Sequence, residues 1–218
     1  MITCSCQKKF QALHSVIAFP RPAGARPVNL VLASTSPYRR ELLERLGLAF
    51  RAVAPEVDES RRPGEPGSAL AARLAEAKAR TVAAHYPDAV VIGSDQVAMC
   101  GDEVFGKPGD HDNAVRQLER LSGREVVFHT AVCAHHAGRD QTGIRVVPYH
   151  VRFRRLERAL IERYLERERP YDCAASAKAE GLGIALIEYM QGEDPTALMG
   201  LPLIALVDLL REQGVEVI

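Results

Sequence analysis

The chain has 218 residues, 47% of which are hydrophobic, and its 28 Lys and Arg residues balance its 28 Asp and Glu residues. That apolar content excludes an intrinsically disordered protein, and the zero net charge argues against a nucleic-acid coat or a polybasic membrane binder. No apolar run approaches the roughly 18 residues that a membrane-spanning helix requires. The five cysteines are scattered and form no second close pair to complete a zinc site, so we expect reduced thiols and a cytoplasmic protein.

Residues 1–27 differ in composition from the rest of the chain. Two lysines precede a short apolar patch over 12–19, and Pro and Gly residues follow the patch up to Pro27. His14 and Ser15 interrupt the patch, which does not fit the longer apolar segment of a signal peptide. We therefore expect a flexible N-terminal extension over 1–27 and one folded domain over 28–218.

The first elements predicted in this domain are a strand over 30–33 and a helix over 37–46, with a Ser-Thr-Ser loop between them. A proline begins the helix, where its missing N–H costs nothing, and leucines recur behind it at helical spacing. Arg39 and Arg40 place positive charge in the first turn, where the helix dipole disfavours cations unless an anion lies between. The loop therefore predicts a seat for phosphate. The alternative is a capped surface helix with two solvated arginines.

Strands and helices alternate through the rest of the domain, with turns that contain Gly or Pro. The predicted strands lie at 50–53, 89–92, 125–134 and 144–155, a hairpin turns at 101–102, and the helices span 68–85, 111–121, 156–168 and 202–212. Ser68 is the expected N-cap of the first of these helices. This interleaving predicts an α/β fold with a mixed sheet flanked by helices. We expect one catalytic domain with two lobes.

Asp95 and a short acidic stretch are the candidate acidic groups of a site. Asp95 follows the strand at 89–92 in a predicted turn, where carboxylates of α/β enzymes commonly face a ligand crevice. It could activate water, hold a divalent metal ion, or simply cap the turn. Glu56 and Asp58, two residues apart, could bind a metal ion through oxygen or form a solvated acidic loop.

Lys78 and Lys107 carry little information alone, because most lysines lie on the surface. Hydrolysis of a phosphoanhydride requires a metal ion, cations that bind the phosphates and a positioned water. The carboxylates could hold the metal ion and position the water, and these two lysines together with Arg39 could supply the cations. The chain contains no glycine–lysine P-loop, so P-loop chemistry is not supported.

Seven short motifs resemble those of the Maf family of nucleoside triphosphate pyrophosphatases, and they occur in the family's order. They lie at 33–40 (ASTSPYRR), 56–59 (EVDE), 74–78 (LAEAK), 93–96 (GSDQ), 106–108 (GKP), 121–123 (LSG) and 199–202 (MGLP). The resemblance covers residues 28–213, and several matches in order are far more specific than any single one. It implies an elongated α/β fold like that of inosine triphosphate pyrophosphatases, with a cleft between two lobes and commonly a homodimer.

The resemblance also implies a role for each candidate residue. The catalytic group consists of two carboxylates and two lysines, namely Asp95, Asp58, Lys78 and Lys107. Asp95 would accept a proton from water, and it would hold Mg²⁺ or Mn²⁺ together with Asp58. Ser34 and Arg39 would bind the triphosphate.

Within the family, the chain is similar to the branch that acts on 7-methyl-GTP. The dTTP and UTP branch is expected to have Arg, Thr and Gln at three specificity positions, where this sequence has Tyr38, Gln96 and Glu180. Two departures, Tyr38 for the branch's usual Trp and Ala179 for Ser, could weaken base selectivity without affecting hydrolysis. We therefore expect a metal-dependent enzyme that converts 7-methyl-GTP to the monophosphate and pyrophosphate. The alternatives are a dTTP/UTP pyrophosphatase of this family and a non-enzymatic regulator of septum formation.

Overall fold

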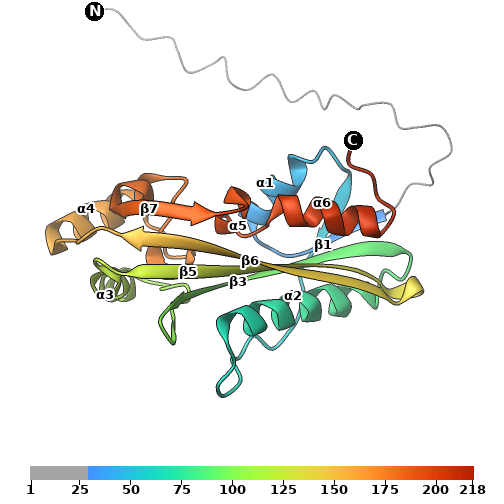
Figure 1. Ribbon diagram of the computed structural model, residues 1–218, viewed down its shortest axis with the longest axis horizontal. Coiled ribbons are helices and arrows are strands. Elements are labelled where there is room, and N and C mark those ends of the chain that lie inside the picture. The colour runs from blue at the N-terminus through green and yellow to red at the C-terminus, as the bar shows by residue number, and fades with distance from the viewer. Residues whose placement is uncertain (1–28) are drawn as a thin grey trace, which may run out of the picture.

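The computed structural model describes residues 29–218, so the extension predicted over 1–27 lies outside the described residues. A seven-stranded mixed sheet runs along the length of the molecule in the order β2-β1-β3-β5-β6-β7, with β4 paired to β3 (Figure 1). The strands are β1 Asn29–Ala33, β2 Phe50–Val53, β3 Ala89–Cys100, β4 Glu103–Val104, β5 Glu125–His136, β6 Gln141–Phe153 and β7 Ile187–Gly192. β1, β2 and β3 are parallel, and the other pairs are antiparallel. The predicted α/β class with a mixed sheet is confirmed.

Helices cover both faces of this sheet (Figure 1). They are α1 Pro37–Glu44, α2 Gly67–Ala83, α3 His111–Leu121, α4 Arg158–Glu168, α5 Pro195–Leu198 and α6 Leu203–Glu212. Because side chains alternate along a strand, Val31 and Val91 pack against α2, while Leu32 and Ile92 pack beneath α1 and α6. A third apolar cluster, built around Phe153, joins α3 and α4 to the other end of β5 and β6. The predicted division into two lobes stays a prediction.

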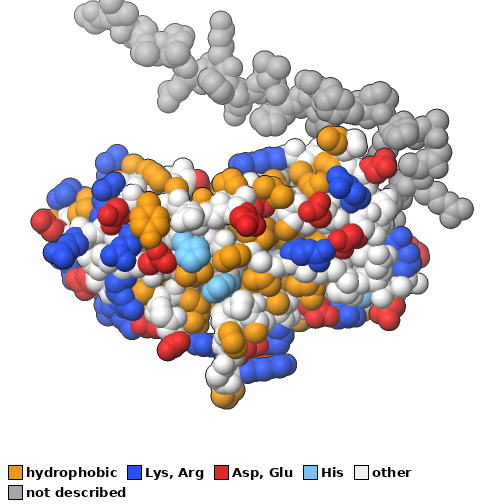
Figure 2. Space-filling view, viewed as in Figure 1, with side chains coloured by type: hydrophobic (Ala, Val, Ile, Leu, Met, Phe, Trp, Pro, Cys, Tyr) orange, Lys and Arg blue, Asp and Glu red, His pale blue; other side chains and the backbone are white. Residues whose placement is uncertain are grey.

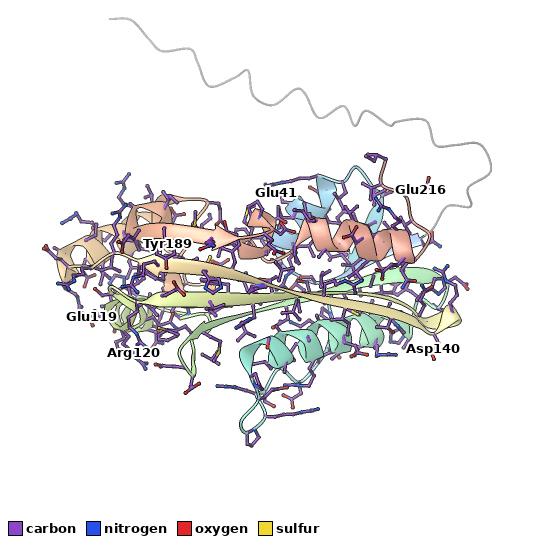
Figure 3. The ribbon with its side chains drawn as sticks, viewed as in Figure 1. Glu41, Glu119, Arg120, Asp140, Tyr189 and Glu216 are labelled. Carbon is purple, nitrogen blue, oxygen red and sulfur yellow. The ribbon has the colours of Figure 1, made fainter. Side chains whose placement is uncertain are left out.

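The viewed face of the molecule carries charges of both signs beside hydrophobic side chains (Figure 2). Figure 2 shows basic and acidic side chains interspersed over the viewed face, in keeping with the zero net charge. Figure 3 shows the two ends of the long axis: Glu119 and Arg120, at the end of α3, lie at one end, and Asp140, in the connection of β5 to β6, lies at the other. Among residues 29–218, every helix is too short or too polar to cross a membrane.

The turn predicted at 93–95, around Asp95, is wrong, because β3 continues without interruption from Ala89 to Cys100. Gly93 is required by packing and not by a turn. A Cβ atom at this position would lie 2.1 Å from the backbone oxygen of Ala75 and 2.8 Å from the backbone nitrogen of Ala79, both on α2. The glycine therefore allows α2 to cross in contact with the backbone of the strand.

Two further boundaries differ from the prediction. α2 begins at Gly67, one residue before the expected cap Ser68, and its first turn packs so closely that a Cβ at Gly67 would lie 2.6 Å from Met99. β5 continues to His136 and β6 begins at Gln141, so both strands extend into the segment between the two predicted strands, and the 3₁₀ helix Ala137–Arg139 lies between them. His135 is buried there, and its Nδ1 lies 2.8 Å from Thr142 Oγ1, so polar residues continue the pairing of the two strands.

Candidate active site

A pocket of about 530 Å³ opens along an edge of β3. β1 pairs with β3 only as far as Gly93, and β4 pairs with it only from Met99 onward. Between these two residues, in the described part of the chain, β3 has a strand partner on the β5 side alone. Asp95 and Gln96 therefore reach a crevice beyond the carboxyl end of a parallel strand, where α/β sheets commonly bind ligands.

The Ser-Thr-Ser loop and the start of α1 form one wall of the pocket. Ser36 is the N-cap of α1, and its Oγ accepts a hydrogen bond from the backbone N–H of Arg39 at 3.4 Å. The Oγ of Ser34 accepts from the N–H of Ser36 at 3.1 Å. This arrangement directs the positive end of α1 toward the pocket, which suits an anion.

Only one of the two adjacent arginines faces the pocket. The Nε of Arg39 donates to the backbone oxygen of Gly200 at 2.8 Å, which leaves its terminal nitrogens for a ligand. Gly200 has φ of +102°, a conformation that favours glycine. Burial lowers the pKa of Arg39, and the charges of Asp95 and Glu59 act in the opposite direction. Arg40 is exposed and pairs with Glu44.

The centre of the pocket is an ammonium group held between two carboxylates. The Nζ of Lys78 lies 2.6 Å from Asp95 Oδ1 and 2.6 Å from Glu59 Oε1. Lys78 and Asp95 are buried at the contact of α2 with β3, while Glu59 reaches them from the exposed segment between β2 and α2. A buried lysine that faces a carboxylate across a helix–sheet contact is unusual unless the pair is functional or fully hydrogen-bonded.

The two carboxylates have pKa values displaced in opposite directions. Burial raises the pKa of Asp95, while the nearby charges of Lys78 and Arg39 act to lower it. The hydrogen bond from Lys78 lowers the pKa of Glu59, and the charge of Lys107 acts in the same direction. Asp95 is therefore the stronger base of the two carboxylates, and Glu59 stays ionised to lower pH.

Asp58 lies outside the pocket, in contrast to the role expected for it. Its carboxylate accepts hydrogen bonds from the N–H and the Oγ of Ser60, both at 2.9 Å, and these bonds lower its pKa. The two neighbouring side chains take different partners, since Asp58 contacts Ser60 while Glu59 reaches Lys78. Glu56 is also exposed and does not line the pocket. Glu59 is thus a candidate functional residue that the sequence did not single out, although it belongs to the motif at 56–59.

The lining of the pocket also includes the residues expected to contact a base: Tyr38, Gln96 and Glu180. Gln96 Nε2 lies 2.9 to 3.0 Å from three acceptors, namely Thr130 Oγ1 and the backbone oxygens of Ala197 and Leu198. Its Oε1 therefore remains for a ligand. The Nζ of Lys178 lies 5.6 Å from the centroid of the Tyr38 ring, in a cation–π contact.

Water is the nucleophile that this arrangement favours. The one cysteine in the lining is Cys173, and burial raises its pKa to about 12, so its thiol stays protonated near neutral pH. Lys107 lies exposed in the pocket wall after β4, and its charge acts on Glu59. A buried carboxylate, cations and a helix N-terminus are the groups that move a water proton and stabilise phosphate charge.

The family described as Maf-like protein matches residues 29–213 of the chain. The chain belongs to the Maf family. Three curated relatives are each named 7-methyl-GTP pyrophosphatase. That of Methylobacillus flagellatus is 57% identical over 189 residues, which is 87% of this chain and 98% of the relative. The relative from Nitrosospira multiformis is 54% identical, and the match covers 87% of this chain and 96% of the relative. The relative from Pseudomonas aeruginosa is 49% identical, and the match covers 87% of this chain and 98% of the relative. The resemblance predicted from the seven motifs is confirmed.

Six of the seven motifs contribute to the pocket of this Maf-family chain, and the exception is the one at 121–123. There the Oγ of Ser122 accepts from the N–H of Leu156 at 2.7 Å, and Gly123 adopts φ of +68°. This motif ends α3 and ties it to the segment before α4. Its role in the Maf fold is therefore structural. Within residues 29–218, no three His, Cys, Asp or Glu side chains converge to hold a metal ion by themselves.

Proposed function

We propose that this Maf-family chain is a metal-dependent nucleoside triphosphate pyrophosphatase that converts 7-methyl-GTP to the monophosphate and pyrophosphate. The observation that carries the proposal is the placement of Lys78 Nζ at 2.6 Å from both Asp95 and Glu59, beside Arg39 and the N-terminus of α1. The names of the relatives support the choice of substrate.

Asp95 acts as the general base in this proposal. It takes a proton from water as the water oxygen bonds to the α-phosphorus, and the bond from that phosphorus to the bridging oxygen of pyrophosphate breaks. Because burial raises the pKa of Asp95, the carboxylate is a stronger base than a solvated aspartate. Lys78 fixes the direction of the carboxylate through its 2.6 Å contact with Oδ1.

The phosphate groups bind along the wall formed by the Ser-Thr-Ser loop and the start of α1. The positive end of the α1 dipole, the terminal nitrogens of Arg39 and the ammonium of Lys107 meet the charge that spreads over the phosphate oxygens as the bond breaks. The Nε of Arg39 is already held by Gly200, so the guanidinium loses little freedom when the triphosphate binds.

The donor set fits Mg²⁺ or Mn²⁺. Mg²⁺ is usually held by one or two carboxylates together with the oxygens of substrate phosphates, so a cage of three protein ligands is not needed. Asp95 and Glu59 would hold the ion here, because each contacts Lys78 through one carboxylate oxygen and has a second oxygen, whereas Asp58 faces Ser60. When bound, the ion would neutralise charge on the phosphate oxygens.

The base end of the pocket favours a positively charged purine with donors on its edge. Methylation at N7 gives guanine a delocalised positive charge, which stacks well on an aromatic ring such as Tyr38. The carboxylate of Glu180 and the free Oε1 of Gln96 are acceptors for the N1–H and the 2-amino group. Uracil and thymine do not offer this pair of donors. The homodimer and the cytoplasmic location implied by the sequence stay predictions.

A nucleotide panel on the purified protein tests this function. With Mg²⁺, pyrophosphate release is expected to be faster from 7-methyl-GTP than from GTP, and slowest from dTTP and UTP. Glu180→Gln removes a charge-assisted hydrogen bond of about 1.5–3 kcal/mol, so kcat/KM for 7-methyl-GTP should fall about tenfold or more, with little change for UTP. Equal rates on UTP and 7-methyl-GTP would contradict the substrate. No release from any nucleotide would favour a non-enzymatic regulator.

Arg39 and its neighbour Arg40 provide a matched pair for testing the phosphate wall. Arg39→Ala and Lys107→Ala should each lower kcat/KM for all triphosphates about 10- to 100-fold, since each removes a charged contact to phosphate and none to the base. The ranking of bases should stay unchanged. Arg40→Ala should behave as the wild type, because the side chain of Arg40 is exposed and pairs with Glu44 outside the pocket. A changed ranking without loss of rate in the Arg39 variant would place this side chain at the base instead.

A further inference from the structure

We infer that Asp194 is a positioning residue: it anchors the segment 194–203 so that backbone oxygens of this segment orient both Arg39 and Gln96. The inference rests on the proposed function for the roles of these two side chains. Asp194 does not line the pocket, so it acts through the segment and not on the substrate.

A single buried carboxylate ties together the starts of two helices. Asp194 is 2% exposed, and its Oδ1 accepts from the N–H of Thr196 at 2.9 Å and from its Oγ1 at 2.6 Å. Its Oδ2 accepts from the N–H of Ile204, in the first turn of α6, at 2.8 Å. Thr196 Oγ1 then accepts from the N–H of Leu203 at 2.8 Å. These hydrogen bonds hold the two ends of the segment 194–203 together.

The oxygens between these ends face the functional side chains. The backbone oxygen of Gly200 accepts from Arg39 Nε at 2.8 Å and from Ser94 Oγ at 2.9 Å. The backbone oxygens of Ala197 and Leu198 accept from Gln96 Nε2 at 2.9 and 3.0 Å. One short segment therefore contacts the phosphate wall and the base end of the pocket at the same time.

These contacts determine which way the amide of Gln96 points. Thr130 is fully buried and donates its hydroxyl proton to the backbone oxygen of Ala197 at 2.8 Å. The hydroxyl therefore accepts from Gln96 Nε2, and the nitrogen of the amide faces three acceptors. Only Oε1 can face the base, so the segment makes Gln96 an acceptor for a base edge with N–H donors.

Asp194→Asn tests the anchor without changing the size of the side chain. The amide replaces one acceptor oxygen by a donor, which then faces an N–H or O–H donor of Thr196 or Ile204. The segment has to shift, and a displacement of about 1 Å at a positioning group can cost about 10²-fold in rate. Both Arg39 and Gln96 should be affected, so loss of rate and loss of base preference should appear together.

The experiment compares Asp194→Asn and Thr196→Val with Ser122→Ala. The control also removes a hydroxyl that accepts a backbone N–H, from Leu156 at 2.7 Å, but it lies at the end of α3 outside the pocket. For each variant, kcat and KM are measured on 7-methyl-GTP, GTP and UTP well below its melting temperature, and Kd for 7-methyl-GTP is measured by calorimetry. Asp194→Asn should lower kcat/KM for 7-methyl-GTP at least tenfold and reduce the ratio of 7-methyl-GTP to UTP. Thr196→Val should show the same pattern more weakly, and Ser122→Ala should change neither quantity.

The inference is overturned if Asp194→Asn melts at a lower temperature but keeps the wild-type kcat/KM, base ratio and Kd, since Asp194 would then only cap helices. If Asp194→Asn does not fold, the same readouts on Thr196→Val decide. A wild type that prefers another nucleotide contradicts the proposed substrate, and the variants are then compared on that nucleotide. A wild type that hydrolyses nothing contradicts the proposed activity, and the change in Kd still tests the anchor.

Discussion

Asp95→Asn is expected to lower kcat by about 10²- to 10⁴-fold, the usual cost of removing a general base. The amide fills the same space and keeps an oxygen toward Lys78, but it cannot accept the proton of water. Lys78 also retains its ion pair with Glu59, so the fold should be nearly unaffected. Pyrophosphate release at saturating 7-methyl-GTP, together with the melting temperature, checks both parts of this expectation.

The pH dependence of the wild type supplies an independent test of the same role. Because burial raises the pKa of Asp95, the ionised base should be lost as pH falls through a value above the ordinary range of aspartate. The acid limb of kcat/KM should lie at that raised value, and the residual activity of Asp95→Asn should lack this limb. Near-full activity in the variant would show that another group accepts the proton.

Lys78→Met is expected to have the second largest effect, because it leaves the buried carboxylate of Asp95 without its cation. The charge and hydrogen bond of Lys78 act to lower the pKa of Asp95, so their removal should raise that pKa further and move the acid limb of kcat/KM to higher pH. At neutral pH a smaller fraction of the base is ionised, and the rate should fall by roughly 10²-fold or more. A pH–rate profile with pyrophosphate release as the readout measures both changes.

Stability should change in the same variant with a definite sign. Breaking a buried ion pair costs about 3–5 kcal/mol when the remaining charge stays ionised. The folded-state pKa of Asp95 would lie above its unfolded value, so the loss should be small at acid pH and should grow as pH rises between the two values. Arg80→Met, on the exposed side of α2, is the matched control and should change stability by about 1 kcal/mol or less. An unmoved acid limb would show that Lys78 does not act through Asp95.

The order of elements could be predicted because local patterns determine it. The helix His111–Leu121 has the predicted bounds, since its cap Asp110 and its apolar spacing are both local signals. Gly93 shows where such signals fail. A glycine that follows an apolar run and precedes polar residues is typical of a turn, but here it allows the backbone of α2 to approach a continuous strand, and that contact comes from residues 14 and 18 positions away, Ala79 and Ala75.

The candidate site could be predicted as a set of motifs, but not as a set of side-chain directions. The sequence does not show whether Arg39 or Arg40 turns inward, or whether Asp58 or Glu59 meets Lys78, because the direction of the backbone decides each choice. The role of Asp194 is harder still to predict from the sequence. Its partners lie on both sides of a loop, and the loop's effect on Arg39 acts across 161 residues of sequence.

The fold separates the residues of this site that are bound to the core from those that are not. Asp95 and Lys78 lie on the central strand and its packed helix at 8% and 6% exposure, so a substitution there disturbs packing as well as chemistry. Glu180 lies exposed between two short 3₁₀ helices, Ala174–Ser176 and Leu182–Leu186, and its replacement removes no core contact. If the protein has the proposed function, mutational drift can change which base is accepted while hydrolysis persists, and the exposed segment around Glu180 is the part of the protein most open to such change.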